Sequence, residues 1–304
     1  MKPPLTDRYS TQLPAIENEL YNYWEGGHFK DKVIFCNCDD PIISKFFHYF
    51  SYNFENLGLK KLMATCYKNT DAYSFSNNES ARGLYIEYNG DKNGNRIPDD
   101  EEIDKYILKG NGDFSSSECI DLLKQSDVVV TAPPYNKVKD YILEVIKHKK
   151  KFLVLGHAFT AVAPRIFPFI KDKKIWLGAG NNKGNSWWFT NMKHGYENPK
   201  ILLYKTYTEK EYPKYDNYNA INVKYKRRIP KDYDGIMGVP LSYLSIHNPK
   251  QFRLVGVDFE VSKGLLPQIV NPDWTGQLAS GQLNGKKVYT RLFIQRRKDD
   301  EGKT

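Results

Sequence analysis

Residues 126–136, Ser126-Asp-Val-Val-Val-Thr-Ala-Pro-Pro-Tyr-Asn136, form an apolar run that stops at two prolines and a tyrosine. The run 127–131 predicts a buried strand, which the prolines end because they fix φ and offer no N–H to a neighbouring strand. In 136–148 valine and isoleucine recur at helical spacing, and 152–155 is a second apolar run. Strand, loop, helix and strand together predict a βαβ unit of an α/β fold.

The loop 132–135 follows the carboxyl end of its predicted strand, where open parallel sheets bind ligands. A strand that ends in Asn/Asp/Ser-Pro-Pro-Tyr/Phe is typical of enzymes that methylate an exocyclic amino nitrogen. In that motif the first side chain and the next backbone carbonyl accept hydrogen bonds from the amine, and the aromatic ring stacks on the base. Here the first position is Ala132, so the side-chain acceptor is missing. The alternative interpretation is a rigid turn between strand and helix.

Composition limits the fold and the compartment. The chain has 304 residues, of which 40% are apolar, enough for one large α/β domain or a core domain with a smaller appendage. The first residues lack the apolar segment of a signal peptide, and no apolar run is long enough to span a bilayer, so we expect a cytoplasmic protein. Four cysteines fit a reducing compartment. Cys36 and Cys38 are expected to share one face of a strand rather than to bind metal.

Positive charge is concentrated in three clusters, at residues 147–151, 224–228 and 291–298, and the net charge is +9. Each cluster alone could be solvated surface. Together, with tyrosine and tryptophan interleaved, they favour a polyanionic partner. The candidate contacts to double-stranded DNA are Lys224, Lys226, Arg227 and Arg228.

The segment 91–102 has the residue types of an EF-hand calcium loop. Oxygen-bearing side chains fall at positions 1, 3, 5, 9 and 12 of that loop, namely Asp91, Asn93, Asn95, Asp99 and Glu102. Position 6, which needs glycine for the sharp turn, is Arg96. A polar β-hairpin turn between two sheet segments is the preferred interpretation, and calcium binding remains the alternative.

Phrases spread over roughly residues 30–260 resemble the EcoRI-type adenine-specific DNA methyltransferases. They are Phe35-Cys-Asn-Cys-Asp-Asp-Pro41, Leu57-Gly-Leu-Lys-Lys61, Asp91-Lys-Asn-Gly-Asn-Arg-Ile-Pro98, Gly110-Asn-Gly-Asp-Phe114, Glu118-Cys-Ile120, Asp127–Tyr135, Ile175-Trp-Leu-Gly178, Tyr215-Asp-Asn-Tyr218, Ala220-Ile-Asn-Val223 and Tyr233-Asp-Gly-Ile-Met-Gly-Val-Pro240. The resemblance implies a Rossmann-like fold, a flipped target adenine, and methyl transfer from S-adenosyl-L-methionine to N6.

The resemblance also implies roles for particular residues. The catalytic segment is Ala132, Pro133, Pro134 and Tyr135, in which the ring stacks on the flipped base and the carbonyls of the first two hold its amine. No metal is expected there, because an amino nitrogen is already a nucleophile. The expected cofactor contacts lie at or just after predicted strand ends, and they are Asn37, Asp39, Asp40, Asp113, Phe114 and Thr131. Asp113 would accept the cofactor's adenine amine, whereas Asp40 could instead cap the next helix.

Two departures from the family affect activity. Ala132 replaces the family's asparagine, and residues 156–163, Gly156-His-Ala-Phe-Thr-Ala-Val-Ala163, differ from the family's asparagine-rich segment. Loss of one preorganised hydrogen-bond partner costs roughly 2.7–4 kcal/mol, or about 10²–10³ in rate. His157 could supply the missing polar group, or it could be a packed or capping residue.

The sequence therefore predicts an α/β, Rossmann-like methyltransferase with a mostly parallel sheet, helices on both faces and a strand-rich C-terminal extension. We expect an N-terminal arm and short helix (1–31), a core that binds S-adenosyl-L-methionine (32–180), and a basic DNA-recognition region (181–304), part of which could complete the core sheet. The expected function is N6-adenine methylation of a flipped base in duplex DNA by a monomer, with activity reduced or altered by Ala132. The alternatives are a catalytically inactive DNA-binding relative, or methylation of RNA or a protein amide.

Overall fold

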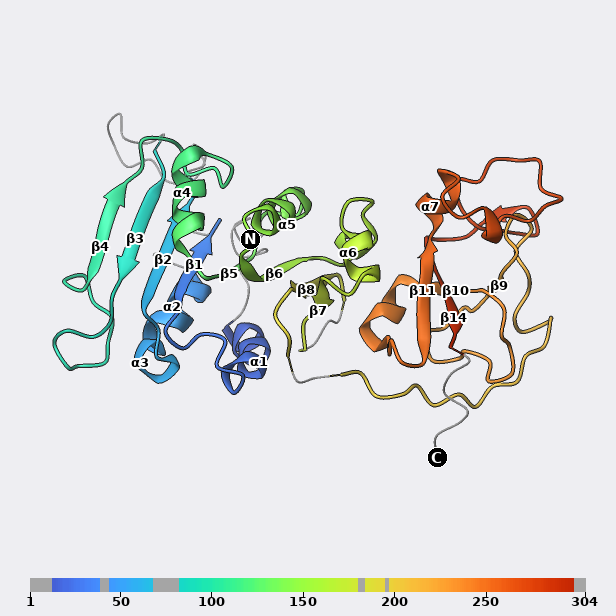
Figure 1. Cartoon of the computed structure of the whole chain (residues 1–304), viewed down its shortest axis with the longest axis horizontal. Coiled ribbons are helices and arrows are strands. Elements are labelled where there is room, and N and C mark those ends of the chain that lie inside the picture. The colour runs from blue at the N-terminus through green and yellow to red at the C-terminus, as the bar shows by residue number, and fades with distance from the viewer. Residues whose placement is uncertain (1–12, 39–43, 68–81, 180–183, 195–196, 298–304) are drawn as a thin grey trace, which may run out of the picture. The chain divides into compact units, whose positions relative to one another are not determined.

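The structure is a computed structural model. It describes residues 13–38, 44–67, 82–179, 184–194 and 197–297. The chain divides into two compact units, one formed by residues 1–160 and 173–196 and the other by residues 161–172 and 197–304 (Figure 1). Within the described ranges, no helix is long and apolar enough to cross a membrane.

The first unit is built on an eight-stranded sheet with the order β4-β3-β2-β1-β5-β6-β8-β7. Its strands are β1 (Val33–Asn37), β2 (Lys61–Cys66), β3 (Leu84–Tyr88), β4 (Ile103–Ile107), β5 (Val128–Thr131), β6 (Lys151–His157), β7 (Trp176–Leu177) and β8 (Ser186–Thr190). The four central strands β2, β1, β5 and β6 are parallel. An antiparallel hairpin, β3–β4, forms one edge, and β8 runs antiparallel between β6 and β7 at the other. The predicted fold class is confirmed.

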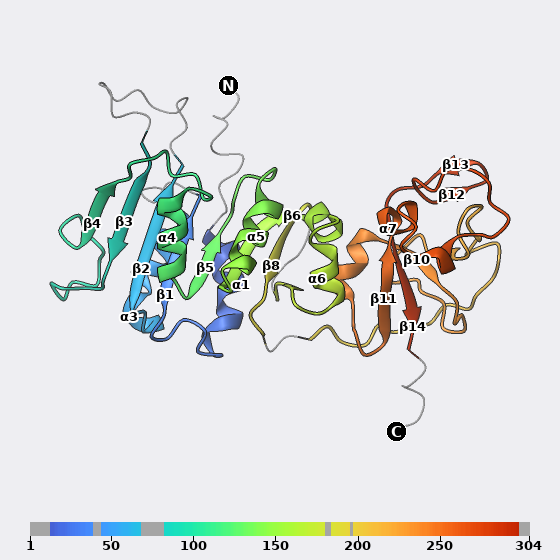
Figure 2. The same cartoon turned by 45° about the horizontal axis from the view of Figure 1, so that its top comes forward.

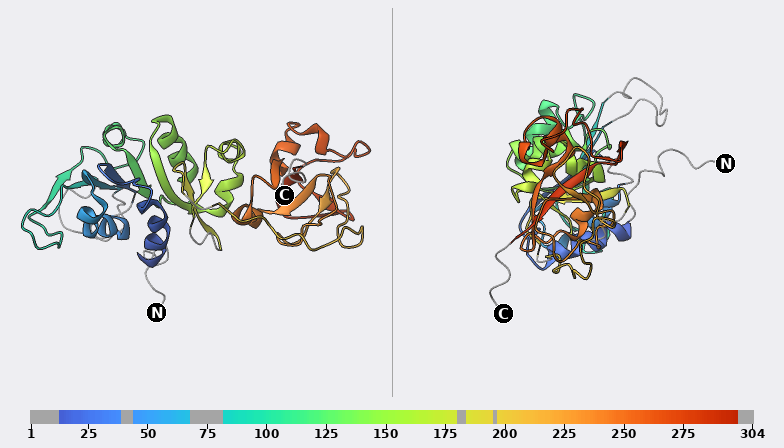
Figure 3. Two further views of the ribbon diagram at one scale, coloured as in Figure 1. Left: turned by 60° about the horizontal axis from the view of Figure 1, so that its bottom comes forward. Right: turned by 90° about the vertical axis from the view of Figure 1, so that its right-hand side faces the viewer.

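Helices cover both faces of this sheet (Figure 2). One face carries α1 (Leu13–Trp24), α2 (Lys45–Tyr52) and α3 (Phe54–Leu57), and the other carries α4 (Ser117–Gln125) and α5 (Val138–Lys147). The left view of Figure 3 brings α1 and α2 forward. Because α5 connects the parallel neighbours β5 and β6, the predicted βαβ unit is confirmed.

Strand alternation distributes the side chains of β1 between the two faces. Ile34 and Cys36 lie in the apolar core under α1–α3. Phe35 and Asn37 therefore point to the face under α4 and α5, and both are buried. A strand buried on both faces is apolar without a break, so the polar side chain of Asn37 at its carboxyl end is the exception to be explained.

A glycine-rich loop, 108–116, packs against the carboxyl end of β2. Gly83 N donates to Gly110 O at 2.8 Å, which ties the loop to the start of β3. Gly112 has φ +78°, and a Cβ at this position would overlap the carbonyl oxygen of Cys66. Glycine is required here by both conformation and space, and it brings the next residue, Asp113, close to the strand ends.

The second unit has a four-stranded sheet with the order β11-β14-β10-β9 and a two-stranded sheet, β12-β13. Its elements are α6 (Phe167–Lys171), β9 (Ile221–Asn222), β10 (Met237–Pro240), β11 (Phe252–Val257), α7 (Asp258–Ser262), β12 (Gln282–Leu283), β13 (Lys286–Lys287) and β14 (Arg291–Arg296), with short 3₁₀ helices. Tyr218 meets Phe293 edge-on in its core, with ring centroids 5.2 Å apart.

A polar network crosses the core of the second unit. The backbone N of Arg291 donates to Asp258 Oδ2 at 2.7 Å, and its Nε donates to Asn222 Oδ1 at 3.2 Å. The Tyr215 hydroxyl donates to the same Asn222 oxygen at 2.8 Å. Burial raises the pKa of Asp258 to about 6, although the Arg291 N–H and the Tyr218 hydroxyl oppose the shift. Arg291 is thus a buried structural residue, so the interpretation of 291–298 as a surface cluster is wrong at its first member.

The sequence pattern also predicts a third strand closed by residues 110–114 and a single helix over 41–57, and both differ from the structure. The segment 110–114 is a loop, because β4 already ends at Ile107. In the described part of 41–57 the helix breaks at Asn53, whose side chain donates to Tyr49 O at 2.8 Å and so ends α2. Cys38 has φ +74° and lies beyond β1, so it does not share a strand face with Cys36.

Candidate functional site

The Pro-Pro-Tyr loop lies directly after the carboxyl end of β5, as predicted. Thr131 is the last strand residue and is fully buried, and Pro133 is buried as well. Ala132 packs partly buried against the core under α1–α3. Lys137 N donates to Pro134 O at 2.8 Å and so closes the turn that leads into α5. The turn leaves the ring of Tyr135 47% exposed beside the strand ends.

Tyr135 belongs to an exposed aromatic cluster drawn from three strand ends. Its ring meets the His157 ring edge-on at 5.7 Å, and its hydroxyl lies 3.1 Å from Ser186 Oγ at the start of β8. His157 stacks on Phe159 with centroids 5.4 Å apart and planes 9° apart. Phe159 is 57% exposed. The cluster offers flat apolar surface for a planar ring at the carboxyl edge of the sheet.

His157 does not replace the acceptor that Ala132 lacks. The backbone N–H of Phe159 donates to His157 Nδ1 at 3.2 Å. This contact assigns Nδ1 as an acceptor, so the neutral ring carries its hydrogen on Nε2. A donor at Nε2 cannot accept a hydrogen bond from an exocyclic amine. The capping role that the sequence left open is the one the structure shows.

Asp113 is placed by the loop that leads from β4 into α4. Its Oδ1 accepts from the backbone N and the hydroxyl of Ser115, at 2.9 and 2.6 Å. Burial acts to raise its pKa, but the two Ser115 hydrogen bonds and the charge of Lys137 outweigh burial and hold the pKa below its usual range. The carboxylate is therefore ionised at neutral pH. Within the described residues its Oδ2 forms no hydrogen bond, so this oxygen can accept one from a ligand.

Glu118 holds the same loop in place, a role that the sequence analysis did not find. Its two carboxylate oxygens accept from the backbone N of Lys109 and of Gly110, at 2.9 and 2.8 Å. These bonds keep its pKa below the usual range. Phe114, predicted beside the cofactor, meets the ring of Tyr141 edge-on at 5.1 Å.

Buried polar atoms without partners gather under the carboxyl ends of β1 and β2. Asn37 Oδ1, Thr65 Oγ1 and the Tyr141 hydroxyl are all buried, and within the described part of the chain they form no hydrogen bond. Asn37 and Thr65 are register partners on adjacent strands, and α5 places Tyr141 on the same face. Desolvation raises the pKa of Tyr141 well above its usual value, so its hydroxyl stays protonated and can donate. Buried polar atoms are normally paired, so this group fits a polar ligand at the strand ends.

Three further residues were predicted to contact the cofactor, namely Thr131, Asp39 and Asp40. Thr131 donates its hydroxyl to the Asn37 carbonyl oxygen, which ties the ends of β1 and β5 together. Asp39 and Asp40 lie outside the described residues. Tyr141 and Thr65 were missed by the sequence analysis. Tyr141 shares a helical face with Val138 and Val145, and that spacing was the available signal.

The basic clusters differ in what their side chains contact. In the first, Lys150 Nζ donates to the carbonyl oxygens of Lys124 and Ser126, at 2.6 and 2.7 Å, which is a structural role. In the second unit, 224–228 is an exposed turn in which the ring of Tyr225 lies between Lys224 Nζ at 5.4 Å and the Arg228 guanidinium at 5.1 Å.

Two members of this turn differ in how freely they can reach a partner. Lys226 Nζ donates to Ser245 Oγ at 2.7 Å, and burial, together with the charge of Arg227, lowers its pKa. Arg227 itself is exposed. The turn therefore presents Lys224, Arg227 and Arg228 to the solvent more freely than Lys226.

Fold and site together define a class. A mostly parallel sheet carries a Pro-Pro-Tyr loop at the carboxyl ends of its strands, which is where the resemblance to methyltransferases that act on amino groups places it. The model of the family "Adenine-specific methyltransferase EcoRI" matches residues 3–187 and 181–297. The chain belongs to this family of adenine-specific DNA methyltransferases.

Named relatives extend over nearly the whole chain. The type II methyltransferase M.EcoRI of Escherichia coli is 38% identical over 96% of this chain and 94% of its own length. M.MgeORF184P of Mycoplasma genitalium is 35% identical over 95% of each chain. M.MpnI of Mycoplasma pneumoniae is 33% identical over 94% of this chain and 97% of its own length. No solved structure gives a significant match.

Proposed function

We propose that this chain transfers the methyl group of S-adenosyl-L-methionine to N6 of an adenine that has been flipped out of duplex DNA. The observation that carries the proposal is the position of Tyr135, half exposed after β5, beside a buried group of unpaired polar atoms. The exposed ring suits a base, and the buried atoms suit a cofactor. A base inside a duplex cannot reach this edge, so it has to leave the stack.

The Pro-Pro-Tyr loop would hold the target base. Tyr135 stacks on it, with Phe159 offering a second exposed ring in the same cluster. The backbone carbonyls of Ala132 and Pro133 accept hydrogen bonds from the amine and direct its lone pair towards the methyl group. The nitrogen would form the new N–C bond as the methyl C–S bond of the sulfonium breaks, which leaves the sulfur as a neutral thioether. The amine would then lose one proton to water, so no covalent enzyme intermediate is needed.

The cofactor would lie across the ends of β1 and β2. S-adenosyl-L-methionine, when bound, supplies the electrophilic methyl group. Asp113 Oδ2 would accept a hydrogen bond from the amine of the cofactor's own adenine. The Tyr141 hydroxyl would donate a hydrogen bond to an acceptor atom of the cofactor. Asn37 and Thr65 offer oxygens to the hydroxyl and ammonium groups of the same ligand. The residues present therefore fit this cofactor in both charge and hydrogen bonding.

Ala132 is proposed to lower the rate without abolishing binding. The side-chain acceptor is absent and His157 offers a donor in its neighbourhood, so one amine hydrogen loses a preorganised partner. In the second unit, the exposed turn 224–228 is proposed to follow the phosphate backbone, because its cations are free to release counterions.

The test is methyl transfer from radiolabelled S-adenosyl-L-methionine to a duplex DNA library, followed by digestion and separation of the nucleosides. We expect label in N6-methyladenine, and none with the Tyr135→Ala variant. Label in N4-methylcytosine would show that the target base is cytosine and not adenine. Absence of label, with DNA and cofactor both bound, would favour a catalytically inactive DNA-binding protein, the candidate that Ala132 supports.

A further inference from the structure

In the loop between β3 and β4, side-chain oxygens accept hydrogen bonds from the loop's own backbone. Asp91 Oδ1 accepts from Gly94 N at 2.7 Å, and Asp91 Oδ2 accepts from Arg96 N at 2.8 Å. Asn95 Oδ1 accepts from Ile97 N at 2.7 Å. Each of these oxygens keeps a further lone pair, so the short loop carries several oxygens that can still accept.

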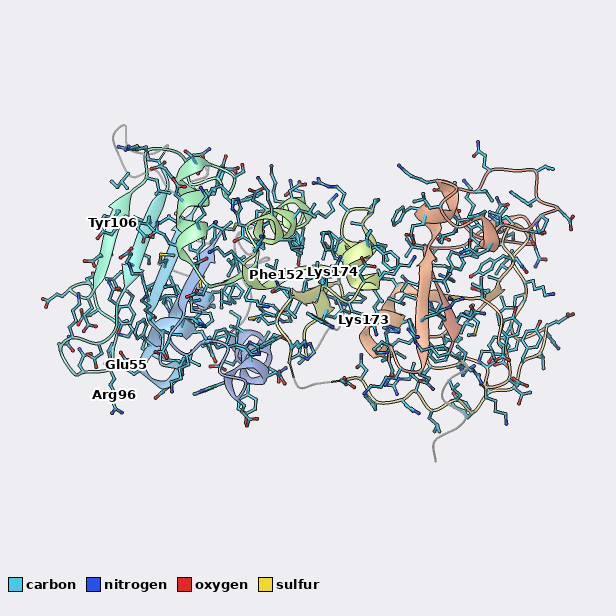
Figure 4. The ribbon with its side chains drawn as sticks, viewed as in Figure 1. Glu55, Arg96, Tyr106, Phe152, Lys173 and Lys174 are labelled. Atoms are coloured by element: carbon cyan, nitrogen blue, oxygen red, sulfur yellow. The ribbon has the colours of Figure 1, made fainter. Side chains whose placement is uncertain are left out.

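Arg96 has the backbone conformation of a glycine. Its φ is +60°, at the sixth position of the loop, and Figure 4 labels it at the outer end of the hairpin. A left-handed backbone is unfavourable for arginine, and it is retained here together with the hydrogen bond from Arg96 N to Asp91. The missing glycine therefore does not prevent the sharp turn.

Glu102 supplies a separate observation that indicates a cation. It is 2% exposed, and its Oε1 accepts from Lys92 N and Asn93 N at 2.6 and 3.2 Å, which turns the carboxylate into the loop. Its Oε2 is buried and has no hydrogen-bond partner in the ranges that the structure describes. A buried carboxylate oxygen without a partner is costly, and a bound cation would remove that cost.

We propose that residues 91–102 bind a calcium ion, with oxygen donors from the side chains of Asp91, Asn93, Asn95 and Glu102 and from the backbone carbonyl of Ile97. These are hard oxygen donors, which calcium prefers, and their spacing along the loop is that of an EF-hand. Asp99 positions the ligands, because it accepts from Glu102 N and from Asn93 Nδ2. The proposed site lies on a β-hairpin rather than between helices. The two interpretations of the sequence, a polar hairpin turn and a calcium loop, are therefore compatible in this segment.

The donor set determines the strength of binding. Among the described residues, no three Asp, Glu, His or Cys side chains converge, so amide and backbone oxygens complete the site. Only Asp91 and Glu102 bring charge to the ion. Calcium loops of low ligand charge bind with Kd of about 10⁻⁴–10⁻³ M, and we expect this range here. Magnesium should bind more weakly, because it requires a rigid octahedral cage and dehydrates reluctantly.

The test is isothermal titration of calcium chloride into the full chain after dialysis against a chelator. We expect saturable heat, which Glu102→Gln weakens by at least about tenfold, the usual minimum for the loss of a metal-site partner. Asp100→Asn is the matched control. It removes the same charge from the same loop, but at an exposed side chain that pairs with Lys105.

A second pair of variants guards against misfolding of the buried Glu102 variant. Asn95→Asp adds a charged ligand at an exposed position and should tighten calcium binding, whereas Arg96→Gly relieves the left-handed backbone in the free and the bound loop alike and should leave the affinity unchanged. The proposal is overturned if calcium gives no saturable heat up to about 10 mM, above the expected range. It is also overturned if Glu102→Gln and Asp100→Asn bind equally well. Neither outcome bears on methyl transfer.

Discussion

The two units bury polar groups in opposite ways. Under the strand ends of the first unit, Asn37, Thr65 and Tyr141 keep buried oxygens that have no partner among the residues with described positions. In the core of the second unit, Arg291, Asn222 and Tyr215 bond to one another.

This difference in hydrogen bonding distinguishes polar groups that stabilise the fold from polar groups that are suited to binding a ligand. A paired network holds a fold together, whereas buried atoms that lack a partner among the described residues are suited to a ligand. Asp258 is intermediate, since it accepts from Arg291 yet keeps one unpartnered oxygen.

The largest expected effect is at the first unit's strand ends. Ala132→Asn should raise N6-adenine methylation by about 10²-fold or more, because it restores a preorganised acceptor for the amine. The measurement is single-turnover methyl transfer on one duplex substrate. Ala132→Val, which fills the position without an acceptor, is the control. If asparagine brings no gain while DNA and cofactor still bind, the defect lies elsewhere, and residues 156–163 become the first candidates.

The next effect tests the second unit through its pH dependence. Because the pKa of Asp258 is raised from 3.8 to about 6, the folded state binds this proton more tightly than the unfolded chain. Stability should therefore rise as the pH falls from about 6 to about 4, by about 2–3 kcal/mol. Asp258→Asn should remove this rise in urea unfolding at the two pH values. An unchanged pH dependence in the variant, or its loss in the exposed control Asp234→Asn, would contradict the assignment.

A smaller effect concerns DNA. Arg227→Ala combined with Arg228→Ala should flatten the dependence of log affinity on log salt by up to about two units, at about 0.9 per phosphate contact. The matched control is Lys286→Ala combined with Lys287→Ala, which removes two exposed cations from β13 of the same unit. Binding to a labelled duplex over a series of salt concentrations measures both slopes. Equal flattening by the two pairs would mean that the turn 224–228 is only part of a diffuse positive surface.

The smallest effect compares two hydroxyls directly. Tyr243 OH lies 3.1 Å from His247 Nδ1 in the second unit, so Tyr243→Phe should cost about 0.5–1.5 kcal/mol of stability. Tyr141→Phe removes a hydroxyl without a partner, and we expect no loss of stability in the free protein. The variant should instead bind S-adenosyl-L-methionine about 2–10-fold more weakly, which is the contribution of one hydrogen bond. Loss of stability without loss of cofactor affinity in Tyr141→Phe would reverse the comparison.

Local pattern was sufficient to predict the central part of the fold and the position of the loop. Residues 128–131 and 152–154 are buried on both faces, so their strands appear as continuous apolar stretches, and the prolines mark the end of the first. Asp113 was selected because it was expected at the end of a strand, but residues 110–114 form a loop, and its contact with the cofactor stays a prediction.

Non-local pairing explains what the sequence did not predict. The insertion of β8 between β6 and β7 depends on register with distant strands. The burial of Arg291 depends on Asp258 and Asn222, which are 33 and 69 residues away. Neither relation leaves a periodic signal along the chain, and a basic residue on a strand has the same pattern whether it faces water or a buried carboxylate.

The discontinuity of the two units has a consequence for synthesis. Residues 161–172 belong to the second unit, yet they leave the ribosome before any of residues 197–304 exist. Ile166 and Phe167 are fully buried in the finished protein. The second unit that contains them cannot pack until the later residues have been synthesised. A fragment ending at residue 196 would keep every strand of the eight-stranded sheet. It would also contain the apolar residues of 161–172 without the rest of the unit to which they belong. Independent expression of the first unit therefore calls for replacing 161–172 with a short polar linker, rather than for a single cut.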